Sequence, residues 1–337
     1  MTIDPRQTIS TTRPTTLLKK PMHRYLSRFL ALCTTLLAFG PAFGADFPAK
    51  AVTLVVPYPA GGGTDTVSRA IARALSTHWR QPVTVENVAG GDGSIGMNKA
   101  LRNPADGTTI VMQVNQMLLW RWTLPQIKTD VLDEVTLLSM VARSPQALVV
   151  SSKLPVKDMK EFADWCETHP CSIASATRLA ELISKQVVQT AGLKAIVVPY
   201  KGTAPMLSDL MGGHITMALP AVSASLGHVR NGTLKFLAVG SPTRFKATSE
   251  VPTLIEQKIP VTGEAWYGLM VAKATPRTAL DALSEGIRAA STDPAVLEAI
   301  ETAGAEPVFS TSPDFTQYVI KEREMLDSLV KKFPMAN

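Results

Sequence analysis

Two glycine-rich segments are the parts of this chain whose residue types and spacing could do chemistry. The first runs from Pro57 to Asp65 and contains three consecutive glycines, and the second, residues 89–96, contains the pattern Gly-x-Gly-x-x-Gly. Each segment follows an apolar run typical of a strand and precedes a run typical of a helix. Glycine lets the backbone approach a ligand closely, and the free N–H groups at a helix start favour an anion. The two segments therefore predict an anion-binding site built largely from main-chain donors.

Neither segment matches a nucleotide-binding or catalytic motif. No Gly-Lys-Ser/Thr follows the first one, which excludes a phosphate-binding P-loop. A dinucleotide site would need an acidic residue about 20 positions after the second one, but residues 113–116 read Gln-Val-Asn-Gln. Asp92 stands two positions before Ser94, so there is no Gly-x-Ser-x-Gly nucleophile elbow, and the histidines make no close-spaced zinc pattern. We expect no catalytic residue, no metal site and no cofactor.

Four further residues each allow two interpretations. Asp65 is either the N-cap of the following helix or a direct contact for a ligand. Lys201 stands before a helix that follows another expected strand, and it either attracts a carboxylate or is a solvated surface lysine. Trp266 and Tyr267 either pack in the core or stack on a ligand.

The elements needed to position these residues alternate between short strands and helices. The order strand-helix-strand-helix-strand at the start predicts a parallel sheet with helices on both faces, so the fold class is α/β. Residues 54–58 and 196–200 share the ending Val-Pro-Tyr before a glycine-containing loop and a helix, which suggests two similar halves facing a cleft. Strands are expected at 51–56, 83–86, 108–112, 147–150, 172–174, 195–198, 215–218, 234–239, 266–271 and 306–309, and helices at 65–78, 96–101, 159–168, 178–191, 204–211, 223–230, 277–290, 293–303 and 313–332.

The net charge of +6, from 34 basic and 28 acidic residues, would by itself point to nucleic acid or an anionic membrane. Residues 1–44 hold six of the basic residues and one of the acidic ones, which leaves the remainder of the chain at +1. Arg24 and Arg28 precede the short apolar run 29–39, and small residues follow at the −3 and −1 positions of a cut between Gly44 and Ala45. This is the pattern of a secretory signal peptide, with Met22 as an alternative start. We therefore expect export, no nucleic-acid partner and a nearly neutral mature protein.

Cys166 and Cys171 are the two cysteines that follow the signal segment. Four residues separate them, so in an oxidising compartment they could close a small local disulfide loop. Two free thiols are the alternative. A metal pair with His169 is disfavoured because no other histidine or cysteine lies near in the sequence.

Beyond these residue-level arguments, the chain after residue 44 resembles the periplasmic solute receptors of the tripartite tricarboxylate transporter system, the TctC or Bug family. The segments that carry the resemblance occur in the family's order: VPYPAGGGTD (56–65), QPVTVENVAGGDGSIG (81–96), NPADGTTI (103–110), VPYKGTAPMLSDLMGG (198–213), VPTLIEQKIP (251–260) and WYGLMVAKATP (266–276). The resemblance implies a type II periplasmic binding protein, in which two α/β lobes joined by two crossover strands close over a small carboxylate.

The implied organisation is a signal peptide at 1–44, the first part of lobe 1 at 45–146, lobe 2 at 147–265 and the C-terminal part of lobe 1 at 266–337. The implied function is a monomeric periplasmic receptor that delivers a small organic acid to membrane transporter subunits or to a sensor protein. The alternative is an exported enzyme that acts on a small carboxylic acid with the same scaffold.

The resemblance also implies which residues hold the carboxylate, with most donors supplied by the main chain. They are Tyr58, Gly61, Gly62, Asp65 and Ser94 on lobe 1, and Ser175, Tyr200, Lys201 and Gly202 on lobe 2. The chain departs from the family twice. The loop after Ser175 lacks the family's longer Ser/Gly-rich stretch with a histidine, so Arg178 could supply charge there. Pro220 stands where members that bind amino acids have an Asp, which predicts a ligand without an amino group.

Overall fold

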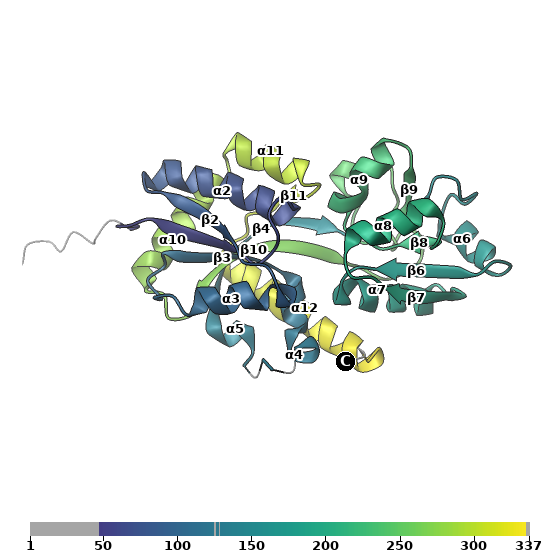
Figure 1. Cartoon of the computed structure of the whole chain (residues 1–337), viewed down its shortest axis with the longest axis horizontal. Coiled ribbons are helices and arrows are strands. Elements are labelled where there is room, and N and C mark those ends of the chain that lie inside the picture. The colour runs from purple at the N-terminus through teal and green to yellow at the C-terminus, as the bar shows by residue number, and fades with distance from the viewer. Residues whose placement is uncertain (1–46, 125, 128, 335–337) are drawn as a thin grey trace, which may run out of the picture. The chain divides into compact units, whose positions relative to one another are not determined.

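The described part of the chain contains two β-sheets with helices on both faces of each. The computed structural model describes residues 47–124, 126–127 and 129–334. It confirms the predicted mixed α/β class, with a six-stranded and a five-stranded sheet (Figure 1). The predicted export signal and its cleavage site between Gly44 and Ala45 lie outside the described residues.

The six-stranded first sheet has a parallel half and an antiparallel half. Its strand order is β11-β4-β10-β3-β1-β2, and β1 is parallel to both β2 and β3, as the strand-helix alternation predicts. β10 is antiparallel to β3 and β4, and β11 is antiparallel to β4. The strands are β1 (Val52–Val56), β2 (Val83–Asn87), β3 (Thr109–Val114), β4 (Val135–Pro145), β10 (Glu264–Ala272) and β11 (Glu306–Pro307).

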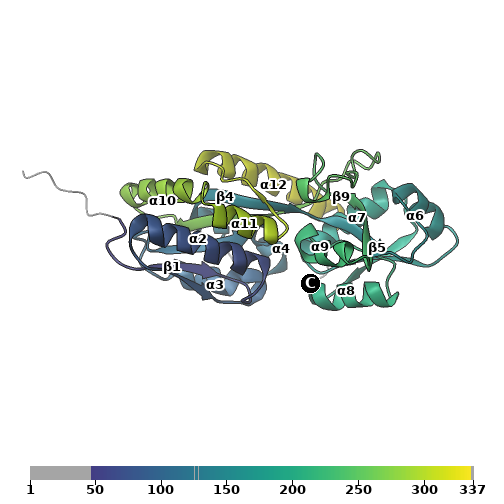
Figure 2. The same ribbon diagram turned by 90° about the horizontal axis from the view of Figure 1, so that it is seen from above.

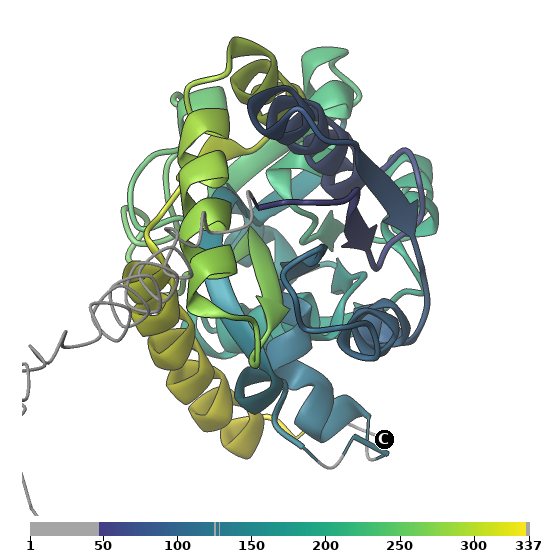
Figure 3. The same cartoon turned by 90° about the vertical axis from the view of Figure 1, so that its left-hand side faces the viewer.

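The helices of the first sheet divide between its two faces because side chains alternate along each strand. Val52, Leu54 and Val56 of β1 pack in one core cluster, and Val55 packs in another. The first cluster includes residues of α2 (Gly63–Trp79), α10 (Arg277–Ala290) and α11 (Pro294–Thr302). The second cluster includes residues of α3 (Ser94–Leu101), η2 (Asn115–Leu119), α4 (Trp120–Thr123), α5 (Val131–Glu134) and α12 (Ser312–Lys332). Figure 3 shows α12, in dark yellow, away from α2, in dark purple.

The five-stranded second sheet has the order β7-β6-β8-β5-β9. β6 is parallel to β7 and β8, whereas β5 is antiparallel to β8 and β9. Figure 2 shows its helices near these strands. The elements are β5 (Ala147–Ser151), α6 (Met159–Cys166), β6 (Cys171–Ser175), α7 (Arg178–Thr190), β7 (Ala195–Pro199), α8 (Thr203–Gly212), β8 (Met217–Ala218), α9 (Val222–Arg230) and β9 (Leu234–Val239), with η3 (Lys246–Thr248) after them.

The chain passes between the two sheets at Gln146 and between β9 and β10. Three segments meet there through backbone hydrogen bonds: Gln146 N–H donates to Gly263 O (2.8 Å), Gly240 N–H to Gln146 O (2.7 Å), and Gly263 N–H to Gly240 O (2.7 Å). A Cβ on Gly240 would lie 2.8 Å from Gly263 O, so only glycine allows this approach. β4 and β10 are therefore the two strands that lead into this junction.

Residues 113–146 differ most from the sequence-based expectation, which assigned no element there. They contain η2, α4, α5 and the eleven residues of β4. Nine of these eleven are buried, so β4 shows no period-two alternation of apolar and polar residues, which is the usual signal of a strand.

Within the described residues, none of the helices combines the length and apolarity that crossing a bilayer requires. From Phe47 onward the chain forms one compact unit. The division into lobes at 146/147 and 265/266 stays a prediction.

Cys166 at the end of α6 and Cys171 at the start of β6 form a disulfide, with an S–S distance of 2.07 Å and both residues buried. The bridge closes the turn that carries the chain from helix to strand.

Removing this disulfide is expected to lower the free energy of unfolding by about 2 kcal/mol, because a short closed loop removes modest chain entropy from the unfolded state. Urea denaturation of the mature chain carrying Cys166→Ser and Cys171→Ser, beside the wild type with and without a reductant, measures the effect. Two titratable thiols in the untreated wild type would contradict the bridge.

Candidate functional site

The first glycine loop is held in shape by the carboxylate of Asp65. One oxygen, Oδ2, accepts hydrogen bonds from Gly61 N–H (2.9 Å) and Arg69 Nε (2.9 Å), and the other, Oδ1, accepts from Asn87 Nδ2 (3.0 Å). Asn87 Nδ2 also donates to Tyr58 O (3.2 Å), and its Oδ1 accepts from Arg69 Nη2 (3.0 Å). The side chains of Asp65, Arg69 and Asn87, here called the loop brace, therefore fix both ends of the loop.

Of the two interpretations of Asp65, the N-cap is wrong. α2 begins at Gly63, and its N-cap is Gly62 in an extended conformation (φ −79°, ψ 170°) with no side-chain cap. Asp65 is the third helical residue, where a carboxylate is favoured by the positive end of the helix dipole. Burial raises the pKa of Asp65, but hydrogen bonds from Arg69, Gly61 and Asn87 outweigh it and leave the pKa below its usual value. Its carboxylate is thus ionised and occupied by the protein's own donors.

Tyr58 turns its hydroxyl towards the end of β3. Val114 N–H donates to Gln113 Oε1 (3.0 Å), so this oxygen is an acceptor, and the Tyr58 hydroxyl at 2.5 Å must donate to it. The Gln113 side chain is buried, and its Nε2 has no hydrogen-bond partner among the described residues. Burial raises the pKa of Tyr58, so the hydroxyl stays protonated.

The second glycine loop reaches α3 through a run of left-handed conformations. Gly91 (φ +54°), Asp92 (φ +52°) and Gly93 (φ +91°) lead directly to Ser94, which is buried. A Cβ on Gly93 would lie 3.0 Å from the Tyr58 hydroxyl and 3.1 Å from Gln113 Nε2. Because L side chains rarely adopt such a φ and no space is left, this glycine is required. The two glycine loops therefore meet over Tyr58 and Gln113.

On the second sheet, two of the predicted residues are neighbours. Tyr200 N–H donates to Ser175 O (2.8 Å), and the strands β6 and β7 place Ser175 opposite Pro199. Ser175 Oγ is buried and has no hydrogen-bond partner among the described residues. The Tyr200 hydroxyl donates to Asp209 Oδ2 (2.6 Å), which raises the pKa of Tyr200. The Tyr200 hydroxyl therefore lies against α8, which carries Asp209.

Two cations follow the ends of these strands, Lys201 after β7 and Arg178 after β6. Lys201 is exposed and forms no ion pair within the described residues. Arg178 lies at the start of α7, and its Nη1 is 3.2 Å from Glu181 Oε2, a carboxylate that it shares with Lys185 (2.7 Å). Gly202 (φ +124°) is the N-cap of α8 and provides no side-chain oxygen to the helix.

The alternatives for Trp266 and Tyr267 are settled in favour of core packing. Trp266 is fully buried and packs edge-on against Phe315, with ring centroids 5.0 Å apart. Tyr267 is buried in the cluster that contains β1 and α2.

The structure groups Tyr58, Gly61, Gly62, Asp65 and Ser94 at the carboxyl ends of β1 and β2. It groups Ser175, Tyr200, Lys201 and Gly202 at the carboxyl ends of β6 and β7. No hydrogen bond or ion pair within the described residues joins the two groups, so their meeting across one ligand stays a prediction.

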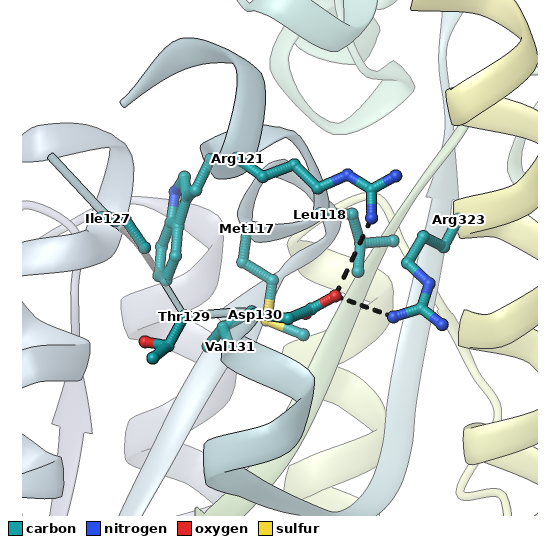
Figure 4. Close-up of a pocket in the computed structure, with 9 residues that line it drawn as sticks. Met117, Leu118, Arg121, Ile127, Thr129, Asp130, Val131 and Arg323 are labelled. Carbon is teal, nitrogen blue, oxygen red and sulfur yellow. Dashed lines mark hydrogen bonds and ion pairs between the residues drawn. The ribbon is translucent and has the colours of Figure 1, made fainter. Parts of the chain in front are cut away.

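Three cavities within the described residues are lined by other side chains. The cavity in Figure 4 has a volume of about 10 Å³. Asp130, which lines it, forms an ion pair with Arg323 (2.9 Å) and a longer one with Arg121 (3.9 Å). Such a space holds a water molecule at most. Two larger open cavities, of about 480 and 860 Å³, border α12.

Sequence reasoning missed Arg69, Asn87 and Gln113. Arg69 follows Asp65 by four residues on a helix, a spacing that indicates an ion pair. Asn87 is the last residue of β2, at the sheet edge where α/β proteins place functional residues. Among the described residues, no group of three or more His, Cys, Asp or Glu could hold a metal ion.

The chain is similar to known proteins in both sequence and structure. Residues 67–335 match the family model described as "Tripartite tricarboxylate transporter family receptor". Protein BugT of Bordetella pertussis is 32% identical over 289 residues, which cover 84% of this chain and 88% of BugT.

Solved structures agree with these sequence matches. A TctC solute-binding protein from Polaromonas, without ligand, has a TM-score of 0.74 at 25% identity and covers 85% of this chain and 100% of its own. A protein from R. palustris solved with adipate has a TM-score of 0.73 at 26% identity and covers 85% of this chain and 98% of its own. The predicted periplasmic binding protein fold is thereby confirmed. The chain belongs to the tripartite tricarboxylate transporter receptor family, the TctC or Bug family of solute-binding proteins.

Proposed function

We propose that this chain is a monomeric, non-catalytic periplasmic receptor for a small organic acid, which it passes to transporter subunits or to a sensor protein. The observation that carries the proposal concerns helix starts. α2, α3 and α8, the three helices that begin in the predicted site, each have a glycine N-cap, Gly62, Gly93 and Gly202, and none has a side-chain cap. The first N–H groups of α2 and α8 have no intrahelical acceptor and are available to an anion, whereas Ser94 N–H at the start of α3 already donates to Gly91 O.

Several helices elsewhere in the molecule contrast with these three, although α9 and α10 also lack a side-chain cap. α6, α7, α11 and α12 are capped by the side chains of Asp158, Thr177, Asp293 and Thr311. Helix N-termini without a side-chain cap bind a carboxylate through neutral N–H donors, so the site requires no buried free cation. In agreement with this, Arg69 and Arg178 form ion pairs with acidic residues of the protein.

Two observations bear on the class of acid. The relative from R. palustris was solved with adipate, an acid without an amino group. Pro220 follows β8, and its side chain offers no acceptor to an ammonium group. The ligand is therefore an amine-free carboxylate.

A thermal-shift panel of organic acids on the mature protein tests this function. Adipate or another amine-free acid is expected to raise Tm by several degrees at concentrations far above Kd, whereas aspartate and glutamate leave it unchanged. If only amino acids raise Tm, the assignment of the ligand class fails.

The enzyme alternative predicts something different for the same sample. A receptor returns the bound acid unchanged, so NMR of the acid after prolonged incubation is expected to show no product. Formation of several product molecules per protein molecule would show that the chain is an exported enzyme instead of a receptor.

A further inference from the structure

The carboxyl end of β3 lies at the same edge of the first sheet as the two glycine loops. β1, β2 and β3 are parallel, so all three strands end at this edge, where α/β proteins bind their ligands. The loops after β1 and β2 carry residues of the proposed site, whereas β3 contributes none to it. β3 ends at Gln113 and Val114, and Asn115 follows. The strand therefore brings two side-chain amides, those of Gln113 and Asn115, to the edge.

The amide of Asn115 is fully used by the protein. Its Nδ2 donates to Glu264 O (2.7 Å) and to Glu322 Oε1 (2.8 Å), so both of its N–H donors have acceptors. Glu264 opens β10 and Glu322 lies on α12. Asn115 thus fastens the end of β3 to β10 and α12 and has no donor left for a ligand.

The amide of Gln113 is held through its oxygen alone. Val114 N–H (3.0 Å) and the Tyr58 hydroxyl (2.5 Å) both donate to Oε1. Because a main-chain N–H can only donate, the oxygen and the nitrogen of this amide cannot be interchanged. Nε2 is buried, and its two N–H donors have no acceptor within residues 47–124, 126–127 and 129–334. Such buried unpaired donors destabilise the folded protein.

The unpaired nitrogen lies at the start of α3. Gly93 is the N-cap of this helix, and a Cβ built on it would lie 3.1 Å from Gln113 Nε2. The main-chain donors here are used by the turn itself, since Gly93 N–H donates to Gly90 O (3.0 Å) and Ser94 N–H to Gly91 O. The Gln113 side chain therefore supplies the donor that the backbone of this turn does not.

The turn that covers the Gln113 amide is strained. Gly91, Asp92 and Gly93 have φ values of +54°, +52° and +91°, and Asp92 adopts the left-handed region without being a glycine. Trp120 Nε1 keeps the turn in place by donating to Asp92 O (3.1 Å). Displacement of the turn by an acceptor would relieve the strain at Asp92 and pair the Nε2 donor at the same time.

We propose that Gln113 is a ligand-contacting residue of the receptor, whose Nε2 donates to one carboxylate oxygen of the bound acid when the turn Gly91–Gly93 shifts to admit it. This assignment rests on the proposed function, because it takes the carboxylate ligand from there. An ionised oxygen is the acceptor that such a donor binds most strongly. The amide also recognises the acid without placing a cation in the site.

NMR of the wild-type mature protein with 15N-labelled glutamine tests the contact directly. The probe is adipate or, if adipate gives no thermal shift, the amine-free acid of the panel with the largest shift. The side-chain signals of Gln113 are identified by their proximity to the Tyr58 ring and the Gly93 α-protons. At saturation one of the two side-chain amide protons is expected to move downfield by about 0.5 ppm or more, because it enters a bond to an ionised acceptor. Unchanged Gln113 signals at saturation would overturn the contact.

Gln113→Glu separates the role of the nitrogen from that of the oxygen. The new carboxylate still accepts from Val114 N–H and the Tyr58 hydroxyl, which favour its ionised form, but it has an acceptor in place of the Nε2 donor. Its affinity for the same acid at pH 8 is expected to be at least ten-fold weaker than that of the wild type. Gln317→Glu introduces the same charge at an exposed glutamine of α12 and is expected to bind as the wild type does. Equal affinities of the two variants would contradict a role for Nε2.

The results distinguish this contact from the proposed function. A wild type that binds an acid while the Gln113 signals remain unchanged keeps the receptor function and rejects the contact. If no acid of the panel binds, the proposed function fails, and the contact fails with it.

Discussion

Replacing Gly304 by alanine is expected to lower the free energy of unfolding by about 3 kcal/mol, through two effects that add. Gly304 follows α11 in a left-handed conformation (φ +67°), which alone costs an L residue about 1 kcal/mol. The new Cβ would also lie 2.5 Å from the Cα of Ser223, at the start of α9. The obstacle is backbone, so it cannot rotate away, and Ser144 Oγ holds Gly304 from the other side through its carbonyl (3.0 Å). Urea denaturation measures the loss.

Gly192→Ala is the matched control for this change. Gly192 has a similar conformation (φ +61°), but a Cβ there would meet nothing within 4 Å. It is therefore expected to show the conformational cost of about 1 kcal/mol without the clash. Equal losses in the two variants would contradict the close contact between Gly304 and Ser223.

Replacing Asp65 by alanine is expected to have the largest effect on binding. The change leaves Gly61 N–H and Arg69 Nε without their acceptor and removes one of the two acceptors of Asn87 Nδ2. Loss of a buried acceptor of this kind costs about 1–3 kcal/mol of stability. The loop before α2 loses its brace at the same time, so the affinity for the organic acid is expected to fall at least ten-fold, or about 1.4 kcal/mol. Calorimetric titration with the acid that gives the largest thermal shift measures it.

Arg73→Ala is the control for this prediction. Arg73 is an exposed cation on the same helix, two turns after Asp65, and it makes no ion pair within the described residues. Its replacement is expected to change stability by less than about 0.5 kcal/mol and to leave binding intact. An Asp65→Ala protein that binds as tightly as Arg73→Ala would show that the loop brace does not support the site.

Local sequence signals predicted the parallel half of the first sheet well. β1, β2 and β3 are short apolar runs separated by glycine, so their ends and their pairing follow from nearby residues. β4 was missed because burial on both faces removes the alternation that identifies a strand. The start of α2 was misplaced because its N-cap is a glycine, which carries no side-chain signal, while the adjacent aspartate resembles a cap.

The partners of the site residues were less accessible to sequence reasoning. Arg69 was within reach, since it lies one helical turn from Asp65. Asn87 bonds to Asp65 only because β1 and β2 pair in a register that sets Val56 opposite Asn87. Glu322 and Asn115 are 207 residues apart and meet through tertiary packing alone. Pairs of this kind depend on the whole fold, and a single sequence carries no signal for them.

The loop brace also bears on how such receptors diversify. Asp65, Arg69 and Asn87 satisfy one another and the loop backbone, so the shape of the loop that we propose binds the carboxylate does not depend on which side chains face the rest of the solute. Positions such as Pro220 or the short turn after Ser175 are then free to vary without loss of the loop. After gene duplication, a receptor could thus bind a new solute through a few substitutions. The loop that holds the carboxylate is stabilised by one set of residues, and the rest of the solute is recognised by another.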